Sequence, residues 1–375
     1  MKKLSLLKVL EGIEDTRRER SVLYPLHEVL FIMLLAVICG ATSYAKVEMF
    51  GNAKKEWLKK YISLEYGVPD ACTFRNVIKE IDTEQLHQVF VEWMKSVVDV
   101  VTGVVAIDGK QARRTKDKTQ RPLHVVSAFS AECRLVLGQL ACGEKSNEIT
   151  AIPQLLDVLE LKGCIVTIDA MGTQTEIANK IIEKEADYIL AVKGNQPNLH
   201  EDIQLFMDDY VNTKGIKETN HYAKTMEKGH GRIETRECYV CEEIDWLTGK
   251  EKWAGLSGIG MILCNIEENG EKSIQKHYYI YSCKGESAES LMRKKRDHWS
   301  IENGLHWVLD MEFREDESRA RKDNSAENLN VLRHMAYNVL KSDTSIKGSF
   351  SDKQFKCLLD DQYLNAIVGL WFLKP

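Results

Sequence analysis

Three acidic residues lie in sequence contexts that suit metal-dependent phosphoryl transfer. Asp108 and Asp169 each follow a four-residue apolar run typical of a buried strand, and Glu302 lies in the polar-aromatic stretch 298–307. A carboxylate at the end of a buried strand faces out at the sheet edge, so two adjacent strands and a packed helix could gather all three. Carboxylates about 4 Å apart repel one another by roughly 1–4 kcal/mol per pair, and bound Mg²⁺, which prefers oxygen ligands, removes that cost.

Such a set of carboxylates could hold two divalent cations about 4 Å apart. One cation would activate a water molecule or a 3′-hydroxyl, and the other would stabilise the departing oxygen of a phosphodiester. No covalent protein intermediate is needed, and the sequence contains no nucleophile-elbow pattern. We therefore expect two Mg²⁺ ions, with Mn²⁺ as a substitute.

Each acidic residue also has an ordinary structural interpretation. An Asp after a strand is often only a turn former, and Asp108-Gly109 is a dipeptide of hairpin turns. Glu302 could lie on an exposed helix face. The joint occurrence of the three acids in the order that one fold requires favours the functional interpretation.

Zinc is the alternative metal. His298, Glu302 and His306 repeat at a spacing of four, but the His-Glu-x-x-His spacing of zinc proteases is absent. Cys238 and Cys241 have metal-ligand spacing without a second pair, which favours two strand cysteines over a zinc site.

Basic residues flank the acids. The net charge of −5 argues against attraction of the whole chain to nucleic acid, so any binding must use local patches. Lys110 and Lys193 could pair with phosphate oxygens, and the basic runs 113–121 and 293–296 could hold a DNA backbone. Taken singly, each run or lysine could equally be a solvated face.

The bulk properties indicate a soluble, multidomain protein. A chain of 375 residues is long enough for two or three domains. The ten cysteines show no paired spacings, which predicts reduced thiols and a cytoplasmic location, nucleoid-associated when DNA is bound. The longest apolar run, 29–41, is too short to span a bilayer and predicts a buried helix and no membrane partner.

The order of elements predicts an α/β protein with a ribonuclease H-like core. Three strand-like runs are followed by alternating helix and strand, which predicts a mixed sheet of three antiparallel strands and then parallel strands. In that order the first and fourth strands are neighbours, which would bring Asp108 beside Asp169. The expected elements are strands 104–108, 123–129 and 135–141, helix 149–159, strand 165–169, helix 174–185 and strand 188–192.

We predict four regions along the chain. Beyond the core we expect strands at 236–240, 260–264 and 277–282, one long helix from 288 to about 313, and a last core helix carrying Leu329 to Leu340. The regions are a helical N-terminal domain (1–97), a catalytic domain in two segments (98–199 and 286–342), a β-rich insertion (200–285) and a C-terminal helical tail (343–375).

Several motifs in fixed order resemble the H-repeat-associated DDE transposases of bacterial insertion sequences. The resemblance covers nearly the whole chain. It is carried by Asp15-x-Arg17, Cys39-Gly40-Ala41, the stretch 67–74, Ala106-Ile107-Asp108-Gly109-Lys110, the stretch 143–153, Asp169-Ala170-Met171-Gly172-Thr173-Gln174, the stretch 191–196, His230-Gly231-Arg232, the stretch 298–310 and Ala326-Glu327-Asn328-Leu329.

The resemblance implies Mg²⁺-dependent DNA cleavage and strand transfer at an Asp-Asp-Glu triad. It assigns the catalytic and metal-binding roles to Asp108, Asp169 and Glu302. The partners would be double-stranded DNA, as the terminal inverted repeats of an element and its target, and a second copy of the chain in the active complex. The candidate DNA contacts are Lys110, Arg113, Arg114, Lys193, Arg232, Arg296, His298, Arg319 and Arg321.

The sequence departs from the wider superfamily around the catalytic Glu. Relatives carry a Tyr seven residues before it, an Arg four before it and a Lys seven after it, where this chain has Lys295, His298 and Leu309. A hairpin-forming cleavage route therefore stays open, and a protonated His298 could replace the Arg as a phosphate contact.

Two other interpretations stay open. The chain could be a catalytically silent DNA-binding relic or regulator derived from such an element, although all three acids are present. It could also be a host repair nuclease, which would share the chemistry but would not need terminal repeats. Inverted repeats and a short target duplication beside the gene would favour the mobile element.

Overall fold

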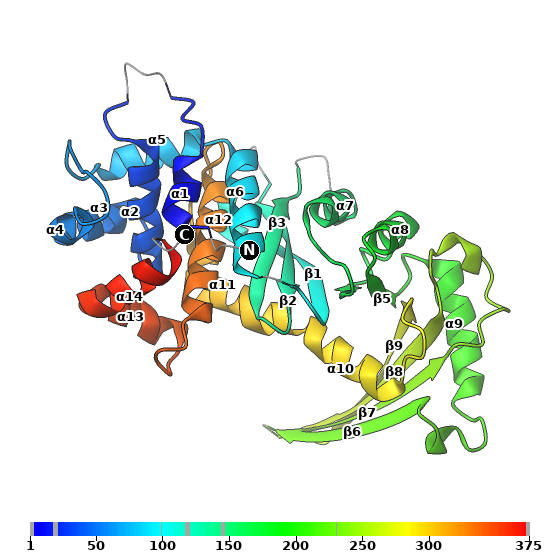
Figure 1. Ribbon diagram of the computed structural model, residues 1–375. Coiled ribbons are helices and arrows are strands. Elements are labelled where there is room, and N and C mark those ends of the chain that lie inside the picture. The colour runs from blue at the N-terminus through cyan, green and yellow to red at the C-terminus, as the bar shows by residue number, and fades with distance from the viewer. Residues whose placement is uncertain are drawn as a thin grey trace.

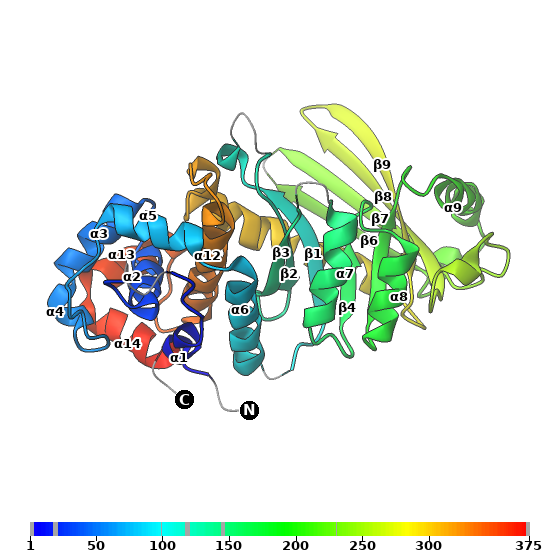
Figure 2. The same ribbon diagram turned by 90° about the horizontal axis from the view of Figure 1, so that it is seen from above.

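The structure is a computed structural model that describes residues 4–17, 22–98, 100–116, 121–143, 147–229 and 231–372. Lys118 of the basic run and His230 of the 230–232 motif lie outside these ranges. The chain is elongated, with a bundle of helices at one end and a long twisted sheet at the other (Figures 1 and 2).

A mixed nine-stranded sheet forms the backbone of the fold, in the order β3-β2-β1-β4-β5-β9-β8-β7-β6. β2 is antiparallel to β1 and β3 to β2, whereas β4 is parallel to β1 and β5 to β4. This confirms the predicted α/β fold with a ribonuclease H-like core. The core strands are β1 (Val104–Gln111), β2 (His124–Ser130), β3 (Leu135–Ala141), β4 (Ile165–Ile168) and β5 (Asp187–Val192).

Helices cover both faces of this core because the side chains of each strand alternate between them. Val105 and Ile107 face α7 (Glu148–Val158) and α8 (Thr175–Glu183), whereas Ala106 faces the helices on the opposite side. That second layer contains α6 (Thr83–Val97), α10 (Ala288–His298), α11 (Trp307–Met311) and α12 (Ser325–Ser342).

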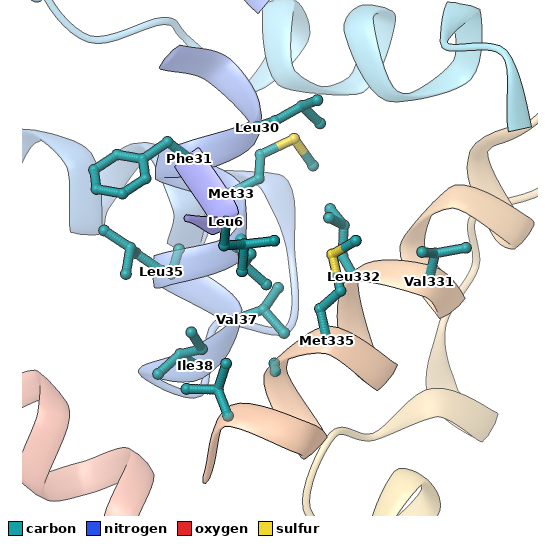
Figure 3. Close-up of a cluster of buried hydrophobic side chains, with 14 of the residues drawn as sticks. Leu6, Leu30, Phe31, Met33, Leu35, Val37, Ile38, Val331, Leu332 and Met335 are labelled. Carbon is teal, nitrogen blue, oxygen red and sulfur yellow. The ribbon is translucent and has the colours of Figure 1, made fainter. Parts of the chain in front are cut away.

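The remaining helices form the bundle at the far end of the molecule. In α2 (Leu26–Ile38) every residue except His27 is buried, and the helix packs against α12 (Figure 3). This confirms the buried helix expected from the apolar run. The helices around it are α1 (Leu6–Glu11), α3 (Tyr44–Ala53), α4 (Lys55–Leu58), α5 (Ala71–Glu80), α13 (Phe350–Leu359) and α14 (Asp361–Trp371).

The C-terminal helices fold back onto this bundle. The indole nitrogen of Trp57 and the hydroxyl of Tyr61 both donate to the side-chain oxygen of Asn365, at 2.8 and 2.6 Å. Lys54 lies 2.5 Å from Asp361. Both ends of the chain therefore contribute to one helical body. Among the described residues, no helix is long and apolar enough to span a membrane.

The predicted insertion continues the core sheet. β9 (Glu271–Tyr281) pairs antiparallel with β5 and begins the extension through β8 (Gly258–Glu268), β7 (Arg232–Cys241) and β6 (Tyr222–Gly229). α9 (Pro197–Tyr210) packs against β9. The three predicted strands were too short and β6 was missed, because an exposed edge strand and the solvated strand ends carry no apolar alternation.

Two other predicted elements differ at the candidate site. β1 continues to Gln111, so Asp108 lies inside a strand and does not end it or open a hairpin turn. The predicted single helix from 288 to about 313 contains a π-helical segment, Glu302–His306, between α10 and α11. Single π-turns within helices are frequent at functional sites.

A buried polar network joins β1 to α12. Glu315 is 1% exposed; its Oε1 accepts from the Asn330 amide at 2.7 Å and lies 3.4 Å from Arg333, and its Oε2 lies 3.2 Å from the Lys110 ammonium. Burial alone would raise the pKa of Glu315, but the charges of Arg333 and Lys110 outweigh burial and lower that pKa to about 2. The carboxylate therefore stays ionised in the interior.

We expect Glu315→Gln to reduce the free energy of unfolding by about 3 kcal/mol at pH 7, because it leaves buried cations without their counter-charge. The folded-state pKa lies below the ordinary 4.5, so this stabilisation is present above about pH 4.5 and is lost as the pH falls toward 2. Urea denaturation across this range should show the two proteins converging at low pH.

Glu317→Gln is the matched control. Glu317 pairs with Arg314 at 3.2 Å, but both side chains are more than half exposed, so its replacement should cost under about 1 kcal/mol. Equal destabilisation by the two substitutions would contradict the network's role.

Candidate functional site

The parallel pairing of β1 with β4 places the two aspartates beside each other. Ile107 is opposite Ile168 in this register, and Asp108 and Asp169 are the next residue on each strand path. Burial raises the pKa of Asp108 to about 7. The negative charges of Asp169 and Glu302 act in the same direction, while a 2.9 Å hydrogen bond from the Gly109 amide opposes them. The three acids are thus electrostatically coupled.

The loop after β4 fixes the orientation of Asp169. Its Oδ1 accepts from the backbone N–H groups of Met171 and Gly172, at 3.1 and 3.4 Å. The loop is in turn held by the segment after β5: the Asn195 amide donates to the Ala170 carbonyl, and the Gln196 amide donates to the Thr173 carbonyl at 2.9 Å. The polar residues of the two segments, after β4 and after β5, therefore serve to hold the Asp169 carboxylate in place.

α10 and the π-helical segment position Glu302. α10 packs against β1 and β4, and its last residue, His298, is 4% exposed with Nδ1 2.9 Å from the Thr167 hydroxyl. Glu302 itself is exposed, one turn further along. The helix is therefore anchored through the buried His298, whereas the Glu302 carboxylate faces solvent.

The environment of His298 differs from the expectation of a protonated phosphate contact. Burial lowers the pKa of His298 to about 3, and the nearby charge of Lys295 acts in the same direction. The imidazole is therefore neutral at physiological pH and lies inside the fold, bonded to β4. Its position indicates a packing role.

Lys295 is a basic residue that converges on the acids. Burial lowers the pKa of Lys295; the charges of Glu302, Asp169 and Asp108 oppose this effect, and that of Lys193 reinforces it. The ammonium also lies 5.8 Å from the ring centroids of both Tyr279 and Trp299. Lys295 stood in the predicted basic run, but only the fold reveals that it faces the carboxylates.

Lys110 is held by acids of its own. Its ammonium lies 2.7 Å from Asp310, 3.2 Å from Glu315 and 3.7 Å from Asp316. Burial favours the neutral amine, but these carboxylates outweigh it and raise the pKa of Lys110. With a side chain 11% exposed, Lys110 stabilises the loop beside Asp108 and is not presented on the surface.

A histidine–carboxylate pair beside Asp108 was not identified from the sequence. His124 Nε2 lies 2.8 Å from Glu148 Oε1, and Glu148 is one of the charges that raise the pKa of Asp108. The pair packs on Gly109: a Cβ at that position would lie 2.1 Å from Glu148 Oε1. The glycine after the catalytic candidate is therefore needed for close approach, a signal that the Asp-Gly-Lys motif already contained.

His306, the last residue of the π-helical segment, lies close to Asp108 of β1. Its Nδ1 lies 3.6 Å from Asp108 Oδ2. Burial lowers the pKa of His306 to about 4, and the charge of Lys110 acts in the same direction. His306 thus faces Asp108 as a neutral ring.

The other predicted DNA contacts lie in three places. Arg232 and Arg296 lie at the extended sheet, paired with Glu234 (at 2.9 Å) and Glu227 respectively. Four more lie where the loop after β1 meets the segment before α12: the Nε of Arg321 donates to the Arg114 carbonyl at 3.0 Å, Arg113 lies 3.1 Å from Asp316, and Arg319 is exposed beside them. Lys193 is exposed at the end of β5.

The donor set at the triad suits a hard cation, because it consists of carboxylates whose mutual repulsion a cation would relieve. Within the described ranges, no group of three or more His, Cys, Asp or Glu side chains is arranged to enclose a metal ion. Closing the set would require the exposed Glu302 side chain to turn toward the aspartates. Cys238 and Cys241 pack in separate apolar clusters on opposite faces of β7.

Comparison with known proteins identifies the family of the chain. Residues 7–94 match the family described as DDE_Tnp_1-associated, and residues 100–339 match the Transposase DDE domain. "Putative transposase YncI" of Escherichia coli O157:H7 is 40% identical, over 97% of this chain and 94% of the relative. "H repeat-associated putative transposase YhhI" of Escherichia coli K12 is 36% identical, over 98% of this chain and 99% of the relative.

A solved piggyBac transposase synaptic complex with hairpin DNA aligns with 99% of this chain and 81% of its own, at 9% identity and a TM-score of 0.49. The two family matches together cover most of the chain, and the relatives align almost end to end. The chain therefore belongs to the H-repeat-associated DDE transposase family of bacterial insertion sequences.

Proposed function

We propose that this transposase cleaves DNA at the ends of its own element and joins those ends to target DNA, using Asp108, Asp169 and Glu302. The observation that supports this most directly is the pairing of β1 with β4, which brings Asp108 beside Asp169. The charges of Asp169 and Glu302 act on Asp108, and those of all three acids act on Lys295. The transposase family to which the chain belongs supports the same reaction class.

The three carboxylates would hold Mg²⁺, with Mn²⁺ as a substitute. When bound, two such ions would supply a metal-activated nucleophile and Lewis-acid stabilisation of the leaving oxygen. The chain's own contribution is to orient the ligands: the Met171 and Gly172 amides hold Asp169, and the Gly109 amide holds Asp108. Within the part of the chain that the structure describes, no backbone amide holds the Glu302 carboxylate in this way, so Glu302 is the ligand that we expect to move when the site closes.

Lys295 and Lys193 would bind the phosphate that is cleaved. Lys295 is partly buried between Tyr279 and Trp299, so its position is fixed, and a fixed cation in a low-dielectric site stabilises developing negative charge more strongly than a solvated one. The exposed Lys193 would contact the adjoining backbone. Lys193 was already a predicted phosphate contact, whereas Lys295 takes the role that the sequence had suggested for Lys110 and His298.

The double-stranded substrate would extend beyond this centre in both directions. Arg113, Arg114, Arg319 and Arg321 would contact phosphates on the side of the helical bundle, and Arg232 and Arg296 on the side of the extended sheet. Joining two element ends requires that both be held together, so we propose a homodimer as the active complex.

We expect Asp108→Asn, Asp169→Asn and Glu302→Gln each to lower the rate of strand cleavage by about 100-fold or more, because each removes charge from the proposed cation ligands. The substrate would be a supercoiled plasmid that carries the gene and its flanking DNA, with Mg²⁺ or Mn²⁺. Gel electrophoresis of nicked and linear products measures the rate.

Glu289→Gln serves as the control for these variants, because Glu289 is exposed in the first turn of α10, on the same helical element as Glu302. It should cleave like the wild type. Unchanged cleavage by any triad variant would overturn its assignment, and DNA binding without cleavage by the wild type with either ion would favour the silent relic.

We expect Lys295→Met to slow cleavage of saturating DNA by roughly 10–100-fold, since a hydrogen bond to a charged group contributes about 1.5–3 kcal/mol. Arg293→Gln is the matched control, because Arg293 is an exposed cation on the same helix, two positions before Lys295. Equal effects of the two substitutions would show that Lys295 acts only as general surface charge.

A further inference from the structure

A cavity of about 640 Å³ lies between the helical bundle and the segment that precedes α12. Its volume is within the range of about 300–1,000 Å³ that is usual for pockets that bind small organic ligands. It is lined by residues of α2, α3 and α5 on one side and by residues 317–333 on the other. None of the triad residues borders it.

The rim of the cavity is strongly basic. Six cationic side chains and a single acidic one, Glu317, line it, although the whole chain has a net charge of −5. Two of the six also have acidic partners outside the lining: Arg333 lies 3.4 Å from the buried Glu315, and Lys79 lies 3.6 Å from Glu80. Two helices, α3 and α12, also begin at the cavity, so their partially positive N-terminal ends add to the same potential. The cations are Arg75, Lys79, Arg319, Arg321, Lys322 and Arg333.

The floor of the cavity has the opposite character. Met33, Val37 and Val47 are almost fully buried in the bundle and border the cavity. The Tyr44 ring stands between floor and rim, with the Arg75 guanidinium 5.7 Å from its centroid. A phosphate alone would use only the rim. An apolar floor and an aromatic side chain in the lining suit a planar, weakly polar group attached to that phosphate.

The cavity is connected to the proposed catalytic site through its rim. Arg321, which lines the cavity, donates to the carbonyl of Arg114 in the loop after β1. Arg113 and Lys110, from the same strand and loop, pair with Asp316. A DNA strand that leaves the triad along this loop would therefore reach the basic rim.

We propose that this cavity binds one unpaired nucleotide of the DNA substrate, with its base on the apolar floor and its phosphate on the basic rim. The inference rests on the proposed function for the identity of the ligand, as a DNA strand and not a free nucleotide. The bundle and the catalytic core would then grip the same DNA molecule.

The test compares two fluorescein-labelled 30-base-pair duplexes of one sequence, perfect or with a single-nucleotide bulge, by fluorescence anisotropy in EDTA so that nothing is cleaved. We expect the wild type to bind the bulged duplex about tenfold more tightly, as one stacked base would provide. Ala320→Trp, which fills the cavity without removing a charge, should abolish this preference and keep the affinity for the perfect duplex.

A second variant keeps the test decisive if Ala320→Trp does not fold. Arg319→Gln/Arg321→Gln changes only exposed side chains and should weaken binding of the bulged duplex more than that of the perfect duplex. Lys60→Gln, an exposed lysine of the bundle outside the cavity, should change neither. Thermal unfolding checks each protein.

Equal affinity of the wild type for the two duplexes would overturn the proposal while leaving the proposed DNA cleavage untouched. So would equal losses on both duplexes in Ala320→Trp. Binding of free dAMP is measured as well. Micromolar binding of dAMP without a preference for the bulged duplex would show that the cavity takes a free nucleotide and not a nucleotide of a DNA strand, and would overturn the proposal. Absence of binding to either duplex would instead count against the proposed function itself.

Discussion

The parallel pairing of β1 with β4 is the constraint on which the rest of the structure depends. Because Ile107 is opposite Ile168, the carboxylates that follow must share one edge of the sheet. Their charges are then too close to be held without compensation, and the surrounding residues supply it in part: backbone amides bind each aspartate, and Lys295 faces the group. Burial raises the pKa of Asp108, and the negative charges of Asp169 and Glu302 act in the same direction.

The same sheet determines how the accessory parts relate to the site. The β-rich segment adds strands directly to β5 through β9, so its position relative to the triad is fixed by a continuous hydrogen-bonded sheet. On the other side, α12 packs against β3 and against α2 of the bundle. Glu315 and its cationic partners join α12 to β1. The nine-stranded sheet thus fixes the β-rich segment relative to the candidate site, and α12 fixes the helical bundle relative to it.

Positive charge gathers in local clusters on this protein, although its net charge is negative. The chain is acidic overall, yet basic side chains gather beside the triad and around the cavity at the bundle. Many other cations are paired with acids, as Lys110 is with Asp310 and Arg236 with Glu227. Paired cations contribute less to long-range attraction than exposed cations without a carboxylate partner. Within the described residues Lys193, Arg319 and Lys322 are exposed cations of the latter kind, and they would contribute most to the attraction of a polyanion.

The sequence by itself determined the fold class, the order of the core strands and the family, because these follow from apolar periodicity and from motifs of adjacent residues. It also pointed to Asp108, Asp169 and Glu302, since each stands at a recognisable position in that order. It could not reveal β6, whose exposed side chains carry no apolar period, or the π-helical segment at Glu302, whose hydrogen bonds leave no local signature.

Only the tertiary structure decided which charged residues face which. His298 and Lys295 are three positions apart on one helix, yet one is buried against Thr167 and the other faces the carboxylates. Lys110 follows Asp108 closely but pairs with acids that are 200 or more positions away. Glu148 reaches Asp108 because Gly109 leaves room for it. Burial and charge pairing depend on contacts between distant segments, and such contacts exist only once the chain has folded.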